Sequence, residues 1–251
     1  MLNWFASGGA DYARYRPEYP TVILDYLLSI TPVHHHALDV GCGTGQLTTL
    51  LACAFDKVTG IDPSQTQIDN AEPHPRVDYC VGPAEQLPHA LHDINLITVA
   101  QAAHWFDLPV FYREAQRVAA PNAVIALISY GVLNPDETLR ARFRRFYYDE
   151  IGLYWPAERQ LVDNGYAGIL FPFTEMSAPD MEIRLQWDLT ALMGYVSTWS
   201  AVKRALDAGQ DALLVRFYDD MHELWGDPAQ KRTFSWPINI RAGHLRQALY
   251  A

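Results

Sequence analysis

Three glycines at alternate positions, directly after a short apolar run, constrain this chain more than any other feature. Residues 37–40 read as a buried strand, and Gly41, Gly43 and Gly45 follow it in the sequence Gly-Cys-Gly-Thr-Gly. Glycine allows positive φ angles and leaves room for a ligand to approach the backbone. A strand, a glycine turn and a helix in this order are typical of the ligand-binding edge of a parallel α/β sheet.

Short apolar runs alternate with helical patterns through the first half of the chain. We expect strands at 37–40, 57–62, 77–81, 94–99 and 123–130, and helices at 46–55, 64–71 and 107–118. Ser64 and Asp107 are candidate N-caps for two of these helices. Near-continuous apolar strands separated by amphipathic helices predict a parallel sheet covered on both faces, and the right-handed crossover rule favours a doubly wound arrangement.

The second half of the chain has a different character. We expect helices at 134–151, 188–199 and 211–225, with half-exposed strands near 183–187 and 231–241. No internal repeat or low-complexity linker separates the halves, so we expect a single domain over residues 1–251. Its parts would be a ligand-binding core at about 30–130, a helical cap at about 131–230 and a last strand at about 231–242.

Composition and charge argue against several classes of protein. The formal net charge of −10 disfavours a nucleic-acid partner, which needs a basic face. The chain has no apolar stretch of about 20 residues, so no membrane helix is expected, and residues 1–20 do not read as a signal peptide. Cys42, Cys53 and Cys80 have no metal-ligand spacing. A reduced, cytoplasmic protein is the simplest interpretation.

The spacing of the glycines selects among nucleotide ligands. A dinucleotide fingerprint has glycine or alanine where this chain has Gln46, and no Gly-Lys-Ser/Thr follows as in a phosphate-binding loop. Asp62 ends the second strand, 23 residues after Asp39. A carboxylate there can accept hydrogen bonds from two vicinal ribose hydroxyls. The sequence therefore predicts a ligand with a ribose but without a pyrophosphate, which disfavours a nicotinamide-dependent oxidoreductase.

Several segments together resemble the class I S-adenosylmethionine-dependent methyltransferases, of the type 11 group. They are Asp-Val-Gly-Cys-Gly-Thr-Gly-Gln at 39–46, Gly-Ile-Asp at 60–62, Pro-Ala-Glu-Gln-Leu-Pro at 83–88 and Val-Ala-Gln-Ala-Ala-His-Trp-Phe-Asp at 99–107. Residues 12–20 and 233–238 resemble trans-aconitate methyltransferase-like proteins. The resemblance implies a Rossmann-like fold, with a doubly wound, mostly parallel seven-stranded sheet and a helical cap, and S-adenosylmethionine as the methyl donor.

The resemblance also implies roles for individual residues near the glycine loop. Gly41, Gly43 and Gly45 would line the methionine and ribose portions of the cofactor. Asp39 would support the methionine amino group, and Asp62 would hold the ribose hydroxyls.

Other cofactor contacts are expected from later and earlier segments. By the same resemblance, Ala84 and Glu85 would lie near the adenine, and Gln101 would lie beside the methionine moiety. The N-terminal stretch is rich in Tyr, Trp and Arg, which supply apolar contact with a polar end. We therefore expect Tyr12 and Arg16 to close over the cofactor as part of a lid.

Methyl transfer from a sulfonium is an in-line displacement, in which the cofactor supplies the reactivity and the protein supplies alignment. We expect a small-molecule acceptor, with a carboxylate as one candidate because it is already ionised. A hydroxyl, amine or carbon acid would need a base, and His104 is then the candidate catalytic residue. Two alternatives remain: His104 is a packing or hydrogen-bonding residue next to Trp105, or the chain binds S-adenosylmethionine or S-adenosylhomocysteine without turnover.

Two other polar clusters have simpler interpretations. His34, His35 and His36 invite a metal site, but adjacent residues point in different directions, so no metal is expected. The arginines between 140 and 145 could hold an anionic substrate, although a solvated helix face explains most of them. The sequence makes no prediction of oligomeric state.

Overall fold

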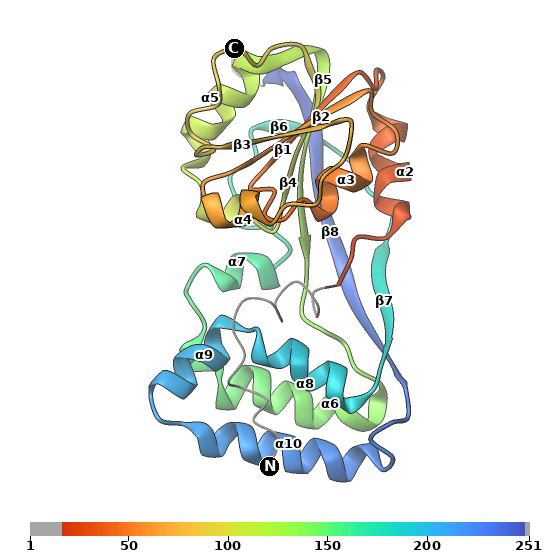
Figure 1. Ribbon diagram of the computed structural model, residues 1–251, viewed down its shortest axis with the longest axis vertical. Coiled ribbons are helices and arrows are strands. Elements are labelled where there is room, and N and C mark those ends of the chain that lie inside the picture. Colours follow the sequence, from red (N-terminus) through yellow and green to blue (C-terminus); the bar gives the residue numbers. More distant parts are fainter. Residues whose placement is uncertain (1–16, 249–251) are drawn as a thin grey trace. The chain divides into compact units, whose positions relative to one another are not determined.

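The computed structural model describes residues 17–248, and their strands form one sheet (Figure 1). Its strands are β1 (His36–Val40), β2 (Lys57–Asp62), β3 (Val77–Val81), β4 (Ile94–Ala100), β5 (Ala119–Tyr130), β6 (Phe173–Met176), β7 (Met181–Trp187) and β8 (Arg232–Ala248). The strand order is β3-β2-β1-β4-β5-β8-β6, and β7 pairs with β8 outside this path. The first five strands run parallel, whereas β8 is antiparallel to β5 and β6. The predicted mostly parallel sheet is confirmed, but the described residues form eight strands rather than the expected seven, because β7 pairs with β8 outside the main path.

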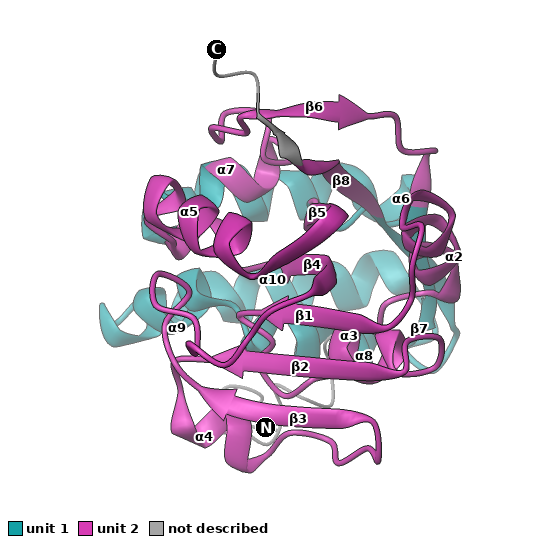
Figure 2. Cartoon of the chain, turned by 90° about the horizontal axis from the view of Figure 1, so that it is seen from above, with its two compact units in different colours: residues 1–17, 132–160, 182–236 teal, residues 18–131, 161–181, 237–251 magenta. Residues whose placement is uncertain are grey.

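The chain divides into two compact units, which Figure 2 colours separately. Among the described residues, the sheet unit comprises 18–131, 161–181 and 237–248, and the helical unit comprises 17, 132–160 and 182–236. The boundary at 236/237 falls within β8, so this strand contributes to both units. A single domain over residues 1–251 stays a prediction.

Helices cover both faces of the sheet in the sheet unit. These helices include α2 (Thr21–Ile30), α3 (Gln46–Leu51), α4 (Gln65–Asp69) and α5 (Leu108–Val118). Figure 1 shows α2 and α3 on one side of the sheet and α5 on the other. The strands are buried along nearly their whole length in β1, β2 and β4, as a sheet covered on both faces requires.

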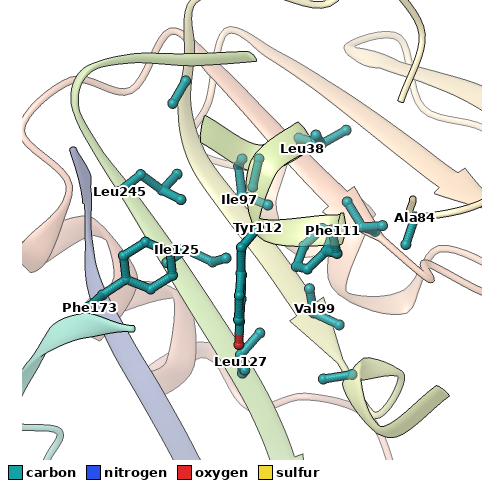
Figure 3. Close-up of a cluster of buried hydrophobic side chains, with 14 of the residues drawn as sticks. Leu38, Ala84, Ile97, Val99, Phe111, Tyr112, Ile125, Leu127, Phe173 and Leu245 are labelled. Atoms are coloured by element: carbon teal, nitrogen blue, oxygen red, sulfur yellow. The ribbon is translucent and has the colours of Figure 1, made fainter. Parts of the chain in front are cut away.

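The sequence of α5 accounts for its start and its packing. The Asp107 carboxylate accepts a hydrogen bond from the Val110 N–H at 3.3 Å, which confirms the predicted N-cap. Phe111 and Tyr112 lie on the buried face of the helix, and Figure 3 shows them among sheet residues such as Val99. Burial of one such aromatic side chain contributes about 1.5–3 kcal/mol to folding.

The helical unit is built around aromatic contacts between its helices. It contains α6 (Glu137–Arg144), which continues as a π-helical turn (Arg145–Glu150), together with α8 (Leu189–Ser197), α9 (Ser200–Asp207) and α10 (Asp211–Trp225). Phe146 stacks on Phe217 of α10 with 3.8 Å between ring centroids. Asp188 caps α8 by accepting the Ala191 N–H at 2.8 Å. Among the described residues, no helix has both the length and the apolar composition needed to span a bilayer.

Some element boundaries differ from the sequence expectations. The helix expected at 46–55 ends at Leu51, and β5 begins at Ala119 rather than residue 123. The helices α2, α7 (Arg159–Asp163) and α9 and the short strand β6 were not expected at all. A four-residue strand carries too few residues for an alternation to stand out, and its place in the sheet comes from pairing with β8 far along the chain.

Candidate functional site

All three glycines of the loop after β1 have positive φ angles: 72° at Gly41, 56° at Gly43 and 88° at Gly45. Side chains disfavour this region of backbone conformation, so the loop geometry itself calls for glycine. The amides of Gly41 and Cys42 donate to the Ile61 carbonyl at 2.7 and 3.0 Å. These bonds hold the loop against the end of β2.

The three glycines differ in what a side chain at each position would contact. A Cβ on Gly41 would lie 2.5 Å from the Ala102 Cβ, and one on Gly45 would lie 2.1 Å from the Tyr79 hydroxyl oxygen. At Gly43, the nearest described atom would be Oε1 of Gln67 at 3.9 Å. Gly41 and Gly45 therefore make room for other side chains of this chain, whereas Gly43 borders nearly open space.

Asp62 joins the glycine loop to the start of α4. One carboxylate oxygen accepts the Gly43 N–H and the other accepts the Ser64 N–H, both at 2.9 Å. Asp62 is 9% exposed at the end of β2. Each carboxylate oxygen has a second lone pair, so the group can accept further hydrogen bonds from a ligand.

Asp39 is buried beneath the same loop. Its carboxylate oxygens accept hydrogen bonds from the hydroxyls of Thr48 at 2.7 Å and Thr98 at 2.8 Å. Burial raises the pKa of Asp39 to about 6, against the effect of the two hydroxyls and with a smaller contribution from the nearby Asp62. Sequence reasoning missed the two threonines, although Thr98 is a polar residue inside an otherwise apolar part of β4.

Gln101 follows β4 in an unusual backbone conformation. Its φ is +56°, which is uncommon for a residue other than glycine. Its side-chain amide donates to the Tyr130 carbonyl at 3.3 Å, and its Oε1 is buried with no hydrogen-bond partner among the described residues. A buried acceptor without a donor costs about 1–3 kcal/mol, so this oxygen suggests a donor group on a ligand.

Ala84 and Glu85 lie in the segment after β3. Ala84 is 4% exposed and belongs to the sheet-unit core. The Glu85 carboxylate accepts the Asp107 N–H at 2.8 Å, so it ties this segment to the start of α5. Their proximity to adenine stays a prediction. Tyr12 and Arg16 lie outside the described residues.

His104 lies in a 3-10 turn (Ala103–Trp105) between β4 and α5. Its Nδ1 is 3.0 Å from the hydroxyl oxygen of Tyr166, and its ring centroid is 4.8 Å from that of Trp105. Trp105 itself is 62% exposed. The ring contact and the hydrogen bond fit a packing or hydrogen-bonding histidine, and the catalytic role of His104 stays a prediction. The Tyr166 contact links positions 62 residues apart, so no local pattern could have predicted it.

The histidines at 34–36 have separate partners. His34 Nε2 lies 3.2 Å from the Leu28 carbonyl, His35 Nδ1 lies 2.7 Å from the Asp56 carboxylate, and the third ring bonds the Thr59 hydroxyl. Burial lowers the pKa of His36. Within the part of the chain that the structure describes, no group of three or more His, Cys, Asp or Glu residues is placed to hold a metal ion.

The arginines of α6 and the following turn form ion pairs with carboxylates or lie over aromatic rings. Arg142 is 10% exposed, with its guanidinium 3.1 Å from Glu150 and 2.6 Å from Asp220. Arg140 pairs with Glu137 one turn away. The expected solvated helix face therefore describes Arg140 but not Arg142, whose side chain is mostly covered.

Four of the predicted residues meet at one edge of the sheet unit. Gly41 contacts the segment after β4 through Ala102, Gly43 bonds Asp62, and Gln101 lies at the start of that same segment. These are the carboxyl ends of the parallel strands β1, β2 and β4, where ligands bind in sheets of this kind.

Comparisons with known proteins show which proteins this chain is similar to. A family model described as a methyltransferase domain matches residues 38–127. A Dictyostelium discoideum protein named as a methyltransferase is 36% identical over 218 residues, which cover 84% of this chain and 81% of that protein. A Saccharomyces cerevisiae protein named as an S-adenosylmethionine-dependent methyltransferase is 25% identical over 130 residues, 48% of this chain and 45% of its own. The particular resemblance to trans-aconitate methyltransferase-like proteins stays a prediction.

A solved structure supports the same grouping over more of the chain. It is described as a type II methyltransferase from Anaeromyxobacter dehalogenans and is 40% identical to this chain. The TM-score is 0.85, and the match covers 92% of this chain and 98% of the other.

Proposed function

Because the chain belongs to the class I S-adenosylmethionine-dependent methyltransferases, we propose that it methylates a small molecule at the edge formed by the loops after β1, β2 and β4. The observation that carries this proposal is the pairing of Gly43 with Asp62 beside nearly open space.

The residues at this edge fit S-adenosylmethionine chemically. Asp62 has lone pairs for the two ribose hydroxyls, and the buried Oε1 of Gln101 suits a positively charged amino group. Gly43 would let the cofactor approach the backbone. When bound, S-adenosylmethionine supplies a methyl group on a positively charged sulfur.

Asp39 would contribute through its charge rather than through direct contact. Its carboxylate is buried and both of its oxygens are held by threonine hydroxyls. A cation bound nearby would favour the ionised form and lower the pKa of Asp39 from about 6. Cofactor affinity should therefore rise with pH through this region, because binding releases the Asp39 proton.

Two classes of acceptor fit a methyl donor at this position. A carboxylate is ionised at neutral pH and needs only to be aligned. A hydroxyl, phenol or amine needs a base, and His104 lies on the segment that follows β4. We also propose that the enzyme acts in the cytoplasm, where its three free cysteines would persist as thiols.

The proposal is tested by binding and by transfer. Calorimetry of the full chain should show binding of S-adenosylmethionine and of S-adenosylhomocysteine. Methyl-labelled S-adenosylmethionine, incubated with a panel of small carboxylic acids, phenols and amines, should label at least one of them. Absence of cofactor binding in the folded protein would refute the proposal, and binding without labelling of any acceptor would support a non-catalytic binding protein instead.

A further inference from the structure

The hydrogen bond between His104 and Tyr166 joins two distant parts of the sheet unit. Tyr166 lies just after α7 (Arg159–Asp163) and is fully buried, with its hydroxyl oxygen 3.0 Å from Nδ1 of His104. The histidine itself is half-buried. A buried hydroxyl that meets the imidazole at hydrogen-bond distance can determine which ring nitrogen carries the proton.

The backbone of Tyr166 has a left-handed conformation, which is unfavourable for a residue with a side chain. Its φ is +62°, and it follows Gly165 with φ +61°. The bonds from the Gly165 N–H to the Val162 carbonyl and from the Tyr166 N–H to the Leu161 carbonyl form a Schellman cap of α7. That cap needs a left-handed residue at Gly165 but not at the tyrosine. The second left-handed residue is therefore unexplained by helix termination, and such outliers concentrate at functional sites.

Neighbouring groups maintain this conformation. Nη1 of Arg241, on β8, donates to the Tyr166 carbonyl at 3.0 Å, while its Nε donates to Glu175 at 3.1 Å. A Cβ on Gly165 would lie 2.7 Å from Cγ of Asn239, so β8 packs closely against the turn. Contacts with β8 therefore hold the backbone of Tyr166, and the Tyr166 hydroxyl lies against His104 in the segment after β4.

We propose that Tyr166 is the positioning residue for His104 and that the methyl acceptor is a protic group, a hydroxyl, phenol or amine, rather than a carboxylate. This inference rests on the proposed function. The proposal requires that the hydroxyl oxygen of Tyr166 accept the Nδ1–H of His104, which would place the imidazole lone pair on Nε2. As the acceptor attacks, its O–H or N–H bond breaks, the proton forms an N–H bond at Nε2, and the acceptor atom keeps the electron pair. An acceptor that is already ionised would not need this arrangement.

The first test reads the tautomer without any cofactor. Nitrogen-15 NMR of the full chain, with the His104 signals assigned by their loss in His104→Gln, should show the proton on Nδ1. Tyr166→Phe keeps the ring and removes the hydroxyl, and it should shift the tautomer away from Nδ1–H. Tyr112→Phe is the matched control: that tyrosine is also buried in the sheet unit, and its hydroxyl donates to the Leu170 carbonyl at 2.7 Å instead. The control should leave the His104 signals unchanged. A wild-type proton on Nε2, or equal effects of the two variants, would overturn the positioning role.

The second test uses whichever acceptor the labelling panel identifies. For a protic acceptor, Tyr166→Phe should lower kcat about 10-fold and His104→Gln about 100-fold or more, with the KM for S-adenosylmethionine unchanged. The double variant should be no slower than His104→Gln alone, because Tyr166 acts through the histidine. An unchanged kcat in Tyr166→Phe, or a carboxylate as the methylated acceptor, would overturn the inference. If the protein binds cofactor but labels nothing, the proposed function fails, while the tautomer still decides the positioning role.

Discussion

Asp62 holds the glycine loop through two hydrogen bonds and, in the proposed function, also binds the cofactor ribose. Its two oxygens already hold the amides of Gly43 and Ser64, and their remaining lone pairs would receive the ribose hydroxyls. We expect Asp62→Ala to weaken binding of S-adenosylmethionine by about 1–3 kcal/mol, the cost of leaving hydrogen-bonding groups unpaired. Calorimetry measures the change, and Asp78→Ala on the exposed side of β3 is the control. Equal affinity of folded Asp62→Ala and wild type would remove Asp62 from the site.

Gly43 differs from its two neighbours because nearly open space adjoins it. We expect Gly43→Val to abolish cofactor binding, since the valine side chain would occupy the space of the ligand. Gly209→Val is a matched control for strain, because Gly209 also has a positive φ, +71°, with nothing described within 4 Å of its Cβ position. Both variants should lose stability in urea unfolding, but only Gly43→Val should lose binding. Retained binding in that variant would mean that the loop is only a turn.

Asp39 makes stability depend on pH in an uncommon direction. Its pKa is about 6 in the folded protein and about 4 in an unfolded chain, so the folded state binds the proton more tightly. Between these values the free energy of unfolding should fall as pH rises, by about 3 kcal/mol in total. Asp39→Asn should remove this contribution, which urea unfolding at pH 4, 5, 6 and 7 would measure. A pH dependence identical to wild type would contradict the buried, ionisable Asp39.

At the residue scale, the sequence predicts which residues belong to the candidate site better than it predicts their contacts. The loop glycines and the two aspartates were recognisable from spacing, because strand ends gather at one edge of a parallel sheet. Tyr79 occupies the space beside Gly45, and Tyr166 forms a hydrogen bond with His104. Each of these contacts joins segments that are far apart in the chain. Such contacts depend on packing, so no local pattern contains them.

At the scale of elements, the strands and the long amphipathic helices were predictable, whereas pieces with few residues or weak signals were not. The cap of α5 lies one residue before the helix and is visible in the sequence. The helix α2 has Pro20 at its N-cap position and buries Ile23, Leu24 and Leu27, a spacing that could have revealed it. The π-helical turn after α6 has no comparable signal, because it is stabilised by contacts with other elements such as that of Phe146 with Phe217.

The link between that π-helical turn and α10 leads to a prediction about Arg142. Its guanidinium lies between Glu150 and Asp220, and the Glu150 side chain is only 14% exposed. Arg142→Ala would leave Glu150, in a poorly solvated place, with only the largely exposed Arg145 at 3.2 Å as a partner, so we expect a loss of about 3 kcal/mol in stability. Arg140→Ala on the same helix breaks an exposed pair and should cost less than about 1 kcal/mol. Urea unfolding compares the two, and similar losses would contradict a structural role specific to Arg142.

At the scale of the whole molecule, the chain alternates between the two units along its length. From residue 18 onward the chain passes between the sheet unit and the helical unit four times. Each unit is therefore assembled from segments that are separated in sequence, and long-range contacts of this kind slow folding. No sequence pattern indicates this interleaving, because the composition changes once near the middle of the chain, whereas the two units alternate along it.

The strand β8 lies between β5 and β6 in the sheet and also supplies residues 232–236 to the helical unit. During synthesis on the ribosome, neither unit can be completed until this strand has left the exit tunnel, after more than nine-tenths of the described residues have been made. A nascent chain would hold the apolar edge of β5 unpaired for that interval, which exposes it to association with other chains. Production of this enzyme in cells should therefore depend on the chaperones that receive nascent chains.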